Sequence, residues 1–201
     1  LWRDLLFVLS GRDILCLSYA DGRLLWSRSG SAAHQFSVPA LGDGILYSAD
    51  RTGVLARVAT NGRVLWKNET VMAWGAATVR IENSLLVQHR DYRSPGGSLV
   101  CLDTLTGTTR WQRPIDRDAN IFPPLVIGDR VLQAAASSLQ LFDLKTGTLL
   151  GHRTFAVPLA GHPLVMDGMI LVPLTDGRIV RLDSETLVTT ASYSHHRERG
   201  N

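Results

Sequence analysis

The feature of this sequence that most restricts its fold is a phrase that recurs every 40 to 45 residues. Three copies end in tryptophan, as DGRLLW at Trp26, NGRVLW at Trp66 and TGTTRW at Trp111. Two weaker copies end at Gly151 and Ala191. A regular period of this length indicates a repeat architecture, in which each unit buries its apolar residues against its neighbours.

The second copy shows what one repeat contains. Four short runs rich in Val, Leu, Ile, Tyr and Trp, namely QFSVPAL, ILYSA, VLARV and RVLWK, are separated by the turn sequences GDG, DRTG and ATNG. Such runs between turns predict a four-stranded antiparallel meander. No copy shows the periodicity of a capped amphipathic helix. Forty residues for four strands is the size of a β-propeller blade, so the sequence predicts an all-β propeller.

About five blades are expected, and the first is incomplete. The first copy has three strand-like runs and none before Leu5 to form an innermost strand, and the polar tail SHHRERGN supplies none either. Because an open array exposes strand edges, we expect the chain to be part of a larger ring. The predicted bounds are 1–27 for the partial blade, 28–67, 68–112, 113–153 and 154–193 for the others, and 194–201 for a polar tail or linker.

Composition argues against several classes of function. The net charge of +3 is small and the basic residues are scattered, so no nucleic-acid partner is expected. The apolar opening segment is interrupted by charged residues, so membrane attachment would require an anchor outside this chain. Cys16 and Cys101 occupy equivalent positions two repeats apart, too far for a disulfide. The six histidines lack the spacing of metal ligands, and no metal site is predicted.

The segment LVCLDTLTGTTRW, residues 99–111, carries the pattern L-x-x-x-D-x-x-T-G-x-x-x-W. This pattern and its weaker copies resemble the repeat of the pyrroloquinoline-quinone-type (PQQ-like) β-propellers. In that family the tryptophan ring docks between neighbouring blades, so the resemblance implies a structural blade-docking role for Trp26, Trp66 and Trp111. By the same resemblance, Gly151 and Ala191 imply less well packed contacts in the last two copies.

Two groups of proteins share this repeat. Quinoprotein dehydrogenases hold PQQ and Ca²⁺ beside a carboxylate base, often with a disulfide between adjacent cysteines. Non-catalytic propellers include the periplasmic lipoprotein of the outer-membrane barrel-assembly machinery and sensor domains fused to kinases. This chain has no adjacent cysteine pair, and its carboxylates lie mostly in turns, where Asp is expected for turn chemistry alone.

We therefore predict a non-catalytic scaffold for protein–protein interaction in the periplasm or cell envelope, similar to the barrel-assembly propeller lipoprotein. No catalytic, cofactor-binding or metal-binding residue is predicted, and the chain is not expected to be an enzyme. The alternatives are a fragment of a PQQ-dependent quinoprotein dehydrogenase, which would bind PQQ with Ca²⁺, and the sensor domain of a membrane-anchored kinase.

One segment departs from its repeat. The third copy has about five extra residues between its second and third strands, within HRDYRSPGG at 89–97. Insertions in repeat proteins map to loops on one face, often the binding face. Arg90, Tyr92 and Arg93 are of types enriched at interaction hot spots, which makes them candidate partner-binding residues. Connectors expected on the same face carry further basic residues, Arg153 among them. The alternative is a tolerated surface insertion without a partner.

Overall fold

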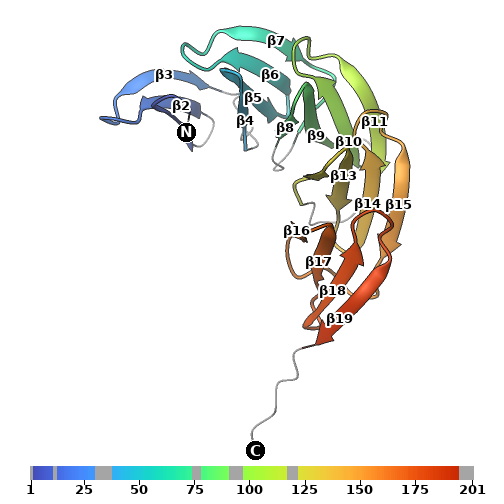
Figure 1. Ribbon diagram of the computed structural model, residues 1–201. Coiled ribbons are helices and arrows are strands. Elements are labelled where there is room, and N and C mark those ends of the chain that lie inside the picture. The colour runs from blue at the N-terminus through green and yellow to red at the C-terminus, as the bar shows by residue number, and fades with distance from the viewer. Residues whose placement is uncertain are drawn as a thin grey trace, which may run out of the picture. The chain divides into compact units, whose positions relative to one another are not determined.

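The computed structural model describes residues 2–10, 13–29, 38–73, 78–90, 97–116 and 122–194 (Figure 1). Within these ranges every regular element is a β-strand, which confirms the all-β prediction. None of the described segments is a helix long and apolar enough to span a membrane. The chain divides into two compact units, Leu1–Pro114 and Ile115–Asn201.

The first unit contains three antiparallel sheets, each a meander whose strands pair in chain order. The first sheet has three strands, β1 (Leu5–Ser10), β2 (Asp13–Ser18) and β3 (Leu24–Ser29). The second has four, β4 (Ala40–Gly42), β5 (Ile45–Asp50), β6 (Gly53–Val58) and β7 (Val64–Asn68). The third also has four, β8 (Val79–Ile81), β9 (Ser84–Arg90), β10 (Gly97–Asp103) and β11 (Thr109–Ile115).

The second unit contains two four-stranded meanders of the same design. One consists of β12 (Leu125–Ile127), β13 (Arg130–Ala134), β14 (Ser138–Asp143) and β15 (Leu149–Thr154). The other consists of β16 (Leu164–Met166), β17 (Met169–Pro173), β18 (Arg178–Asp183) and β19 (Thr189–Ser194). A short first strand followed by three longer ones is thus the common pattern of the described four-stranded sheets.

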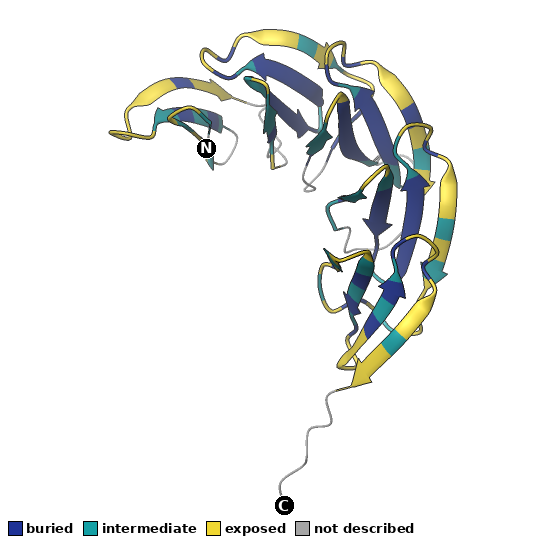
Figure 2. Ribbon diagram, viewed as in Figure 1, coloured by how far each residue is buried: buried dark blue, intermediate teal, exposed yellow. Residues whose placement is uncertain are grey.

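Buried side chains gather on the middle strands of each sheet, whereas the last strand is mostly exposed (Figure 2). In the second sheet β5 and β6 are buried almost continuously, whereas β2 and β17 alternate between buried and less buried residues. In the first unit one core joins the second and third sheets, through Tyr47, Ala49, Val54, Leu85, Val87, Val100 and Leu102. In the second unit the core joins both sheets, through Leu132, Leu139, Leu141, Ile170, Val172, Val180 and Leu182.

The first sheet has three strands, as predicted, but the residues just before β1 differ from the prediction. Trp2 forms an antiparallel bridge with Leu5, with backbone N···O distances of 2.9 and 3.1 Å. In the second sheet Gly42, the last residue of β4, pairs with Ile45 in the same way. Arg3 and Asp4 between them have positive φ angles of 43° and 60°, as a tight hairpin requires. Trp2 therefore takes the place of the last residue of a first strand, which sequence reasoning had left empty.

The Asp-x-x-Thr part of the repeat builds the turn before the last strand. Asp103 Oδ1 accepts hydrogen bonds from the backbone N–H groups of Leu105 and Thr106, both at 2.9 Å, and from Thr106 Oγ1 at 3.1 Å. Thr106 Oγ1 is also 2.8 Å from Thr108 Oγ1. Asp143 and Asp183 make equivalent bonds in the second unit. The carboxylate thus satisfies backbone donors that the hairpin leaves without partners.

In the first unit the tryptophans of β3 and β7 lie on the corresponding turn of the next sheet. The Nε1–H group of Trp26 donates to the carbonyl of Ala59, and that of Trp66 donates to the carbonyl of Thr104, both at 2.9 Å. Each ring covers the glycine of the turn. A Cβ atom added at Gly107 would lie 2.5 Å from the Trp66 ring, so only glycine leaves room for the indole. Trp111 is also buried, with an exposed fraction of 5%.

In the contact between the fourth and fifth sheets, the large and the small residue change places. Gly151 stands where the tryptophan would be, and Leu187 stands where the turn glycine would be. Leu187 keeps the left-handed backbone, with a φ of 57°, and its side chain is 3% exposed. Its Cδ1 atom lies 3.3 Å from the position of a Cβ on Gly151. The looser packing expected at Gly151 is therefore wrong, because the leucine fills the space from the opposite side.

This exchange predicts strong coupling between positions 151 and 187. Gly151→Trp alone forces the indole into Leu187 and should lower the free energy of unfolding by about 1–3 kcal/mol. Leu187→Gly alone empties the space, which costs about 2–5 kcal/mol in other large-to-small core changes, and regains the roughly 1–2 kcal/mol that leucine loses in the left-handed region. The double variant recreates the Trp66–Gly107 arrangement, so it should be more stable than the two single effects predict. Urea unfolding of all four proteins measures this coupling; additive effects would contradict it.

The turn aspartates predict a loss of stability in acid. Hydrogen bonds from Arg110 and from the turn hold the pKa of Asp103 at about 2, and the Thr146 and Thr186 hydroxyls lower the pKa values of Asp143 and Asp183. The folded state therefore favours ionised carboxylates. Their contribution is complete above the ordinary aspartate pKa of about 4 and is lost as the pH falls towards 2.

Unfolding free energies measured from pH 7 to pH 2 test this expectation. Asp103→Asn should flatten the decline between pH 4 and pH 2. The matched variant Asp167→Asn changes an exposed aspartate in a turn between first and second strands, and it should leave the decline unchanged. An equal effect of both substitutions would show that net charge, rather than turn hydrogen bonding, governs the acid sensitivity.

Candidate functional site

The predicted partner-binding loop lies at the end of an extended hairpin. β9 and β10 are seven residues long and pair up to Arg90 and Gly97. Arg90 is the last residue of β9, but its side chain lies outside the described residues, as do Tyr92 and Arg93. Their role in binding remains a prediction. The paired stem shows that the insertion extends the hairpin without disturbing the four-stranded sheet.

The stem of this hairpin is attached to the connector that follows β7. Ala73 and His89 form an antiparallel bridge. The Nδ1 atom of His89 lies 2.9 Å from the backbone nitrogen of Met72 and 3.1 Å from its carbonyl oxygen. These contacts hold the end of β9 against the connector that follows β7.

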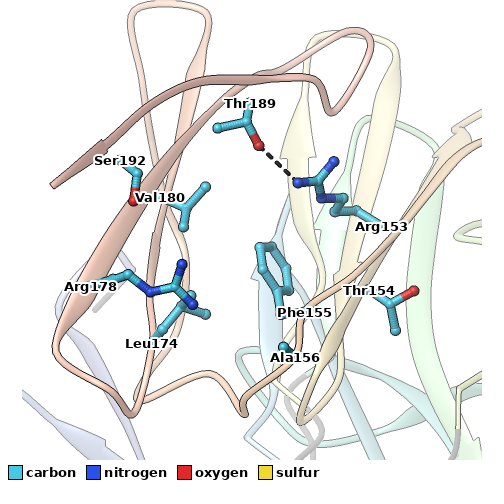
Figure 3. Close-up of a pocket in the computed structure, with 9 residues that line it drawn as sticks. All are labelled: Arg153, Thr154, Phe155, Ala156, Leu174, Arg178, Val180, Thr189 and Ser192. Carbon is cyan, nitrogen blue, oxygen red and sulfur yellow. Dashed lines mark hydrogen bonds between the residues drawn. The ribbon is translucent and has the colours of Figure 1, made fainter. Parts of the chain in front are cut away.

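A pocket of about 250 Å³ lies between the two sheets of the second unit (Figure 3). Its walls come from the end of β15, the connector after it, the start of β18 and the strand β19. The lining residues are Arg153, Thr154, Phe155, Ala156, Leu174, Arg178, Val180, Thr189 and Ser192. The pocket combines apolar side chains with two guanidinium groups and three hydroxyl-bearing strand residues.

The two arginines of the pocket have different partners. Arg178 Nε donates to Asp176 Oδ2 at 2.8 Å, so part of its charge is neutralised. Arg153 Nη2 donates to Thr189 Oγ1 at 2.9 Å, and its Nε is buried without a hydrogen-bond partner. Among the described residues, no carboxylate forms an ion pair with Arg153. Within the described part of the chain, the positive charge of Arg153 therefore has no acidic partner.

A serine, an aspartate and a histidine also meet in the second unit. Ser138 Oγ donates to Asp116 Oδ2 at 2.5 Å, and His152 Nε2 lies 2.8 Å from the same oxygen. A nucleophilic serine would need to bond the histidine that takes its proton. Here both side chains bond the carboxylate, and Asp116 N–H donates to Gln140 Oε1 at 3.0 Å. This arrangement holds the segment after β11 in place and does not activate the serine.

The thiols are buried. Cys16 and Cys101 are both free in this structure, and burial raises the pKa of each. A raised pKa keeps a thiol protonated and unreactive, so both residues act as small apolar side chains. Within the described ranges there is no group of three or more His, Cys, Asp or Glu side chains placed to hold a metal ion.

Sequence reasoning placed Arg153 on a connector of the expected binding face but did not find the pocket. Arg153 and Arg178 are far apart in the chain, in segments without a shared motif. The available signal was the repeat itself, which aligns Arg153 with Arg28, both two residues after the docking position. Only the packing of the two sheets shows that Arg153 and Arg178 line one pocket.

The family follows from the sequence as a whole. The family profile described as "Outer membrane protein assembly factor BamB" matches residues 10–95, 52–152 and 97–198. The chain belongs to the PQQ-like β-propeller family. No protein of curated function matches its sequence significantly.

Solved structures support the propeller fold. BamB from Moraxella catarrhalis is 17% identical with a TM-score of 0.72, and the match covers 94% of this chain and 58% of that one. Quinohemoprotein alcohol dehydrogenase ADHIIG from Pseudomonas putida HK5 is 13% identical with a TM-score of 0.75, over 95% of this chain and 40% of that one. The computationally designed protein Ika8 is 18% identical with a TM-score of 0.68, over 95% and 61%.

The chain thus spans less than two thirds of each of these proteins. BamB, a quinohemoprotein alcohol dehydrogenase and a designed protein share the fold, so the fold by itself does not indicate one function.

Proposed function

We propose that this chain is part of a non-catalytic β-propeller scaffold that binds a protein partner. The observation that carries the proposal is the match of the BamB profile along residues 10–198. Assembly factors act through contacts with other proteins, and propeller loops provide such contacts on a rigid frame. The extended β9–β10 hairpin, with Arg90, Tyr92 and Arg93 at or near its end, is the surface we assign to the partner.

The same profile supports a location outside the cytoplasm, in the periplasm or cell envelope. Burial of both cysteines as free thiols is compatible with that location, because neither residue has a partner with which to form a disulfide. Protease accessibility of the chain in cells with a permeabilised outer membrane, compared with fully lysed cells, tests the location.

The second candidate function is that of a quinoprotein dehydrogenase fragment, favoured by the structural likeness to quinohemoprotein alcohol dehydrogenase. Such a protein needs several oxygen ligands converging on Ca²⁺ and a carboxylate positioned as base. Titration of the purified chain with PQQ and Ca²⁺, followed by quinone fluorescence, separates the two candidates. We expect no saturable binding; saturable binding with reduction of a dye by an alcohol would favour the dehydrogenase.

Photocrosslinking tests the assigned surface. A photoreactive phenylalanine at position 92 should trap a discrete partner in intact cells. The matched control is position 19, an exposed tyrosine in the turn between β2 and β3. The strands β1 and β2 correspond to β9 and β10, and the β2–β3 turn lies at the opposite end of its sheet from the β1–β2 turn. The same residue at position 19 should trap little or nothing. Equal products from both positions would contradict the assignment.

A double substitution tests the energetic role of the loop. Tyr92→Ala with Arg93→Ala should lower partner affinity by about tenfold or more, as expected for hot-spot side chains, and should leave the melting temperature unchanged. Isothermal titration with the crosslinked partner, once purified, measures the affinity. Unchanged affinity would mean that the loop is a tolerated surface insertion.

A further inference from the structure

We propose that the pocket between the sheet β12–β15 and the sheet β16–β19 is a binding site for a carboxylate attached to a small apolar group. The inference goes beyond the scaffold function and does not depend on it, because it rests only on the residues of the second unit. It concerns the chemistry of the ligand: one negative charge and a body about the size of one side chain.

The charge of the ligand follows from Arg153. Its Nε is buried without a partner, while its Nη2 is held by Thr189 Oγ1. An N–H group of a guanidinium that is buried without an acceptor is unfavourable, and a carboxylate is the acceptor whose geometry fits a guanidinium best. The bond to Thr189 fixes the orientation of the guanidinium before a ligand arrives. A site organised in advance spends less binding energy on ordering its side chains.

The second guanidinium strengthens the preference for an anion. Arg178 lies on the opposite wall of the pocket, with its terminal nitrogens directed towards Phe155 (Figure 3). Asp176 accepts from Nε of Arg178, and among the described residues no acceptor binds the two terminal nitrogens of Arg178, which remain available as donors. A carboxylate in the pocket would be attracted by both positive charges and would accept hydrogen bonds from the arginine nearer to it. Ser192 adds a hydroxyl at the same wall as Arg178.

The apolar part of the ligand follows from the other walls. Phe155, Ala156, Leu174 and Val180 line the pocket, and Phe155 lies between the two arginines in Figure 3. The Cζ atom of Arg153 is 6.0 Å from the centre of the Phe155 ring, at the outer limit of a cation–π contact. A ligand with an apolar group beside its carboxylate would therefore cover the ring as it pairs with the arginines.

The volume limits the size of the ligand. A pocket of about 250 Å³ is smaller than the roughly 300–1,000 Å³ of sites that enclose drug-sized molecules or cofactors. It has room for one side chain with a carboxylate or for a small aromatic acid. Two sources share this chemistry: the carboxylate of a peptide or a free organic acid.

The equivalent position in the first unit provides a matched control. Arg28 follows Trp26 by two residues, as Arg153 follows Gly151, and its Cζ is 5.9 Å from the Trp26 ring. Unlike Arg153, Arg28 donates from Nη2 to the carbonyl of Asn61 at 3.2 Å and from Nη1 to the carbonyl of Ser27 at 2.7 Å. Both of its terminal nitrogens therefore already donate to backbone oxygens, and it should respond to an added carboxylate less than Arg153 does.

The test uses 3-phenylpropionate and its uncharged amide, which have the same shape. The signal of the Arg153 Nε–H group, assigned by its loss in Arg153→Gln, is followed by nuclear magnetic resonance during titration of the whole chain. The acid should shift this signal saturably, and it should bind about tenfold or more tightly than the amide, as expected for charge-assisted hydrogen bonds. The shift should weaken with added salt, and the Arg28 signal should move less than that of Arg153.

Variants complete the test. Arg153→Gln and Arg178→Gln should each weaken binding of the acid about tenfold, whereas Arg28→Gln should leave it unchanged. Thr189→Val retains both charges and should weaken binding less, which keeps the test informative if an arginine variant unfolds. No shift with the acid, equal affinity for acid and amide, or equal loss with Arg28→Gln would each overturn the proposal.

Peptides identify the source of the carboxylate. Three short peptides are compared: one ending in a free phenylalanine carboxylate, the same peptide amidated, and one with an internal glutamate beside a leucine. Tighter binding of either charged peptide than of 3-phenylpropionate assigns the site to a protein ligand, and tighter binding of the free acid assigns it to a small molecule. Because no cellular partner is involved, the result is independent of the photocrosslinking experiment.

Discussion

The contact between the last strand of one sheet and the last turn of the next is the interaction on which the rest of the structure depends. A single sheet of four short strands cannot bury both of its faces, so each repeat requires a neighbour. In the first unit an indole ring covers the turn glycine and its N–H bonds a turn carbonyl, as for Trp66 with Gly107 and Thr104. This hydrogen bond fixes the position of one sheet along the next, which apolar packing alone would not do.

The turn that receives the ring is prepared by its aspartate. Asp103 binds the backbone of its own turn and so holds the following residues in the conformation that presents Gly107. The contact of Gly151 with Leu187, between the sheets β12–β15 and β16–β19, shows which feature of the turn is required. Leu187 retains the left-handed backbone at a cost of about 1–2 kcal/mol for a side chain in that region. The turn keeps its backbone conformation although the large side chain is now in the turn and the glycine in the strand. The conformation is therefore the stricter requirement, and the large side chain can come from either of the two sheets.

Both of the sites to which we assign a binding role lie where one repeat differs from the others. The extended β9–β10 hairpin departs from the repeat by insertion, and the pocket of the second unit lies between the two sheets that exchange the tryptophan for a leucine. Arg153 follows Gly151 by two residues in β15, and its partner Thr189, the first residue of β19, follows the turn residue Leu187 by two. Residues two apart in a strand lie on the same face, so the contact at Gly151 and the proposed pocket at Arg153 lie on the same side of β15.

The sequence by itself determined the fold class, the length of the repeat and most of the turns. These features depend on local patterns: apolar runs of strand length, Asp–Thr–Gly turn chemistry, and a tryptophan at a constant position. It did not show that Trp2 ends a first strand, because one residue carries no pattern. It suggested a weak contact at Gly151, because the compensating Leu187 lies in the next repeat and becomes its neighbour only when the sheets pack. For the same reason, only the tertiary structure could bring Arg153 and Arg178 to one pocket, since their proximity depends on packing between sheets.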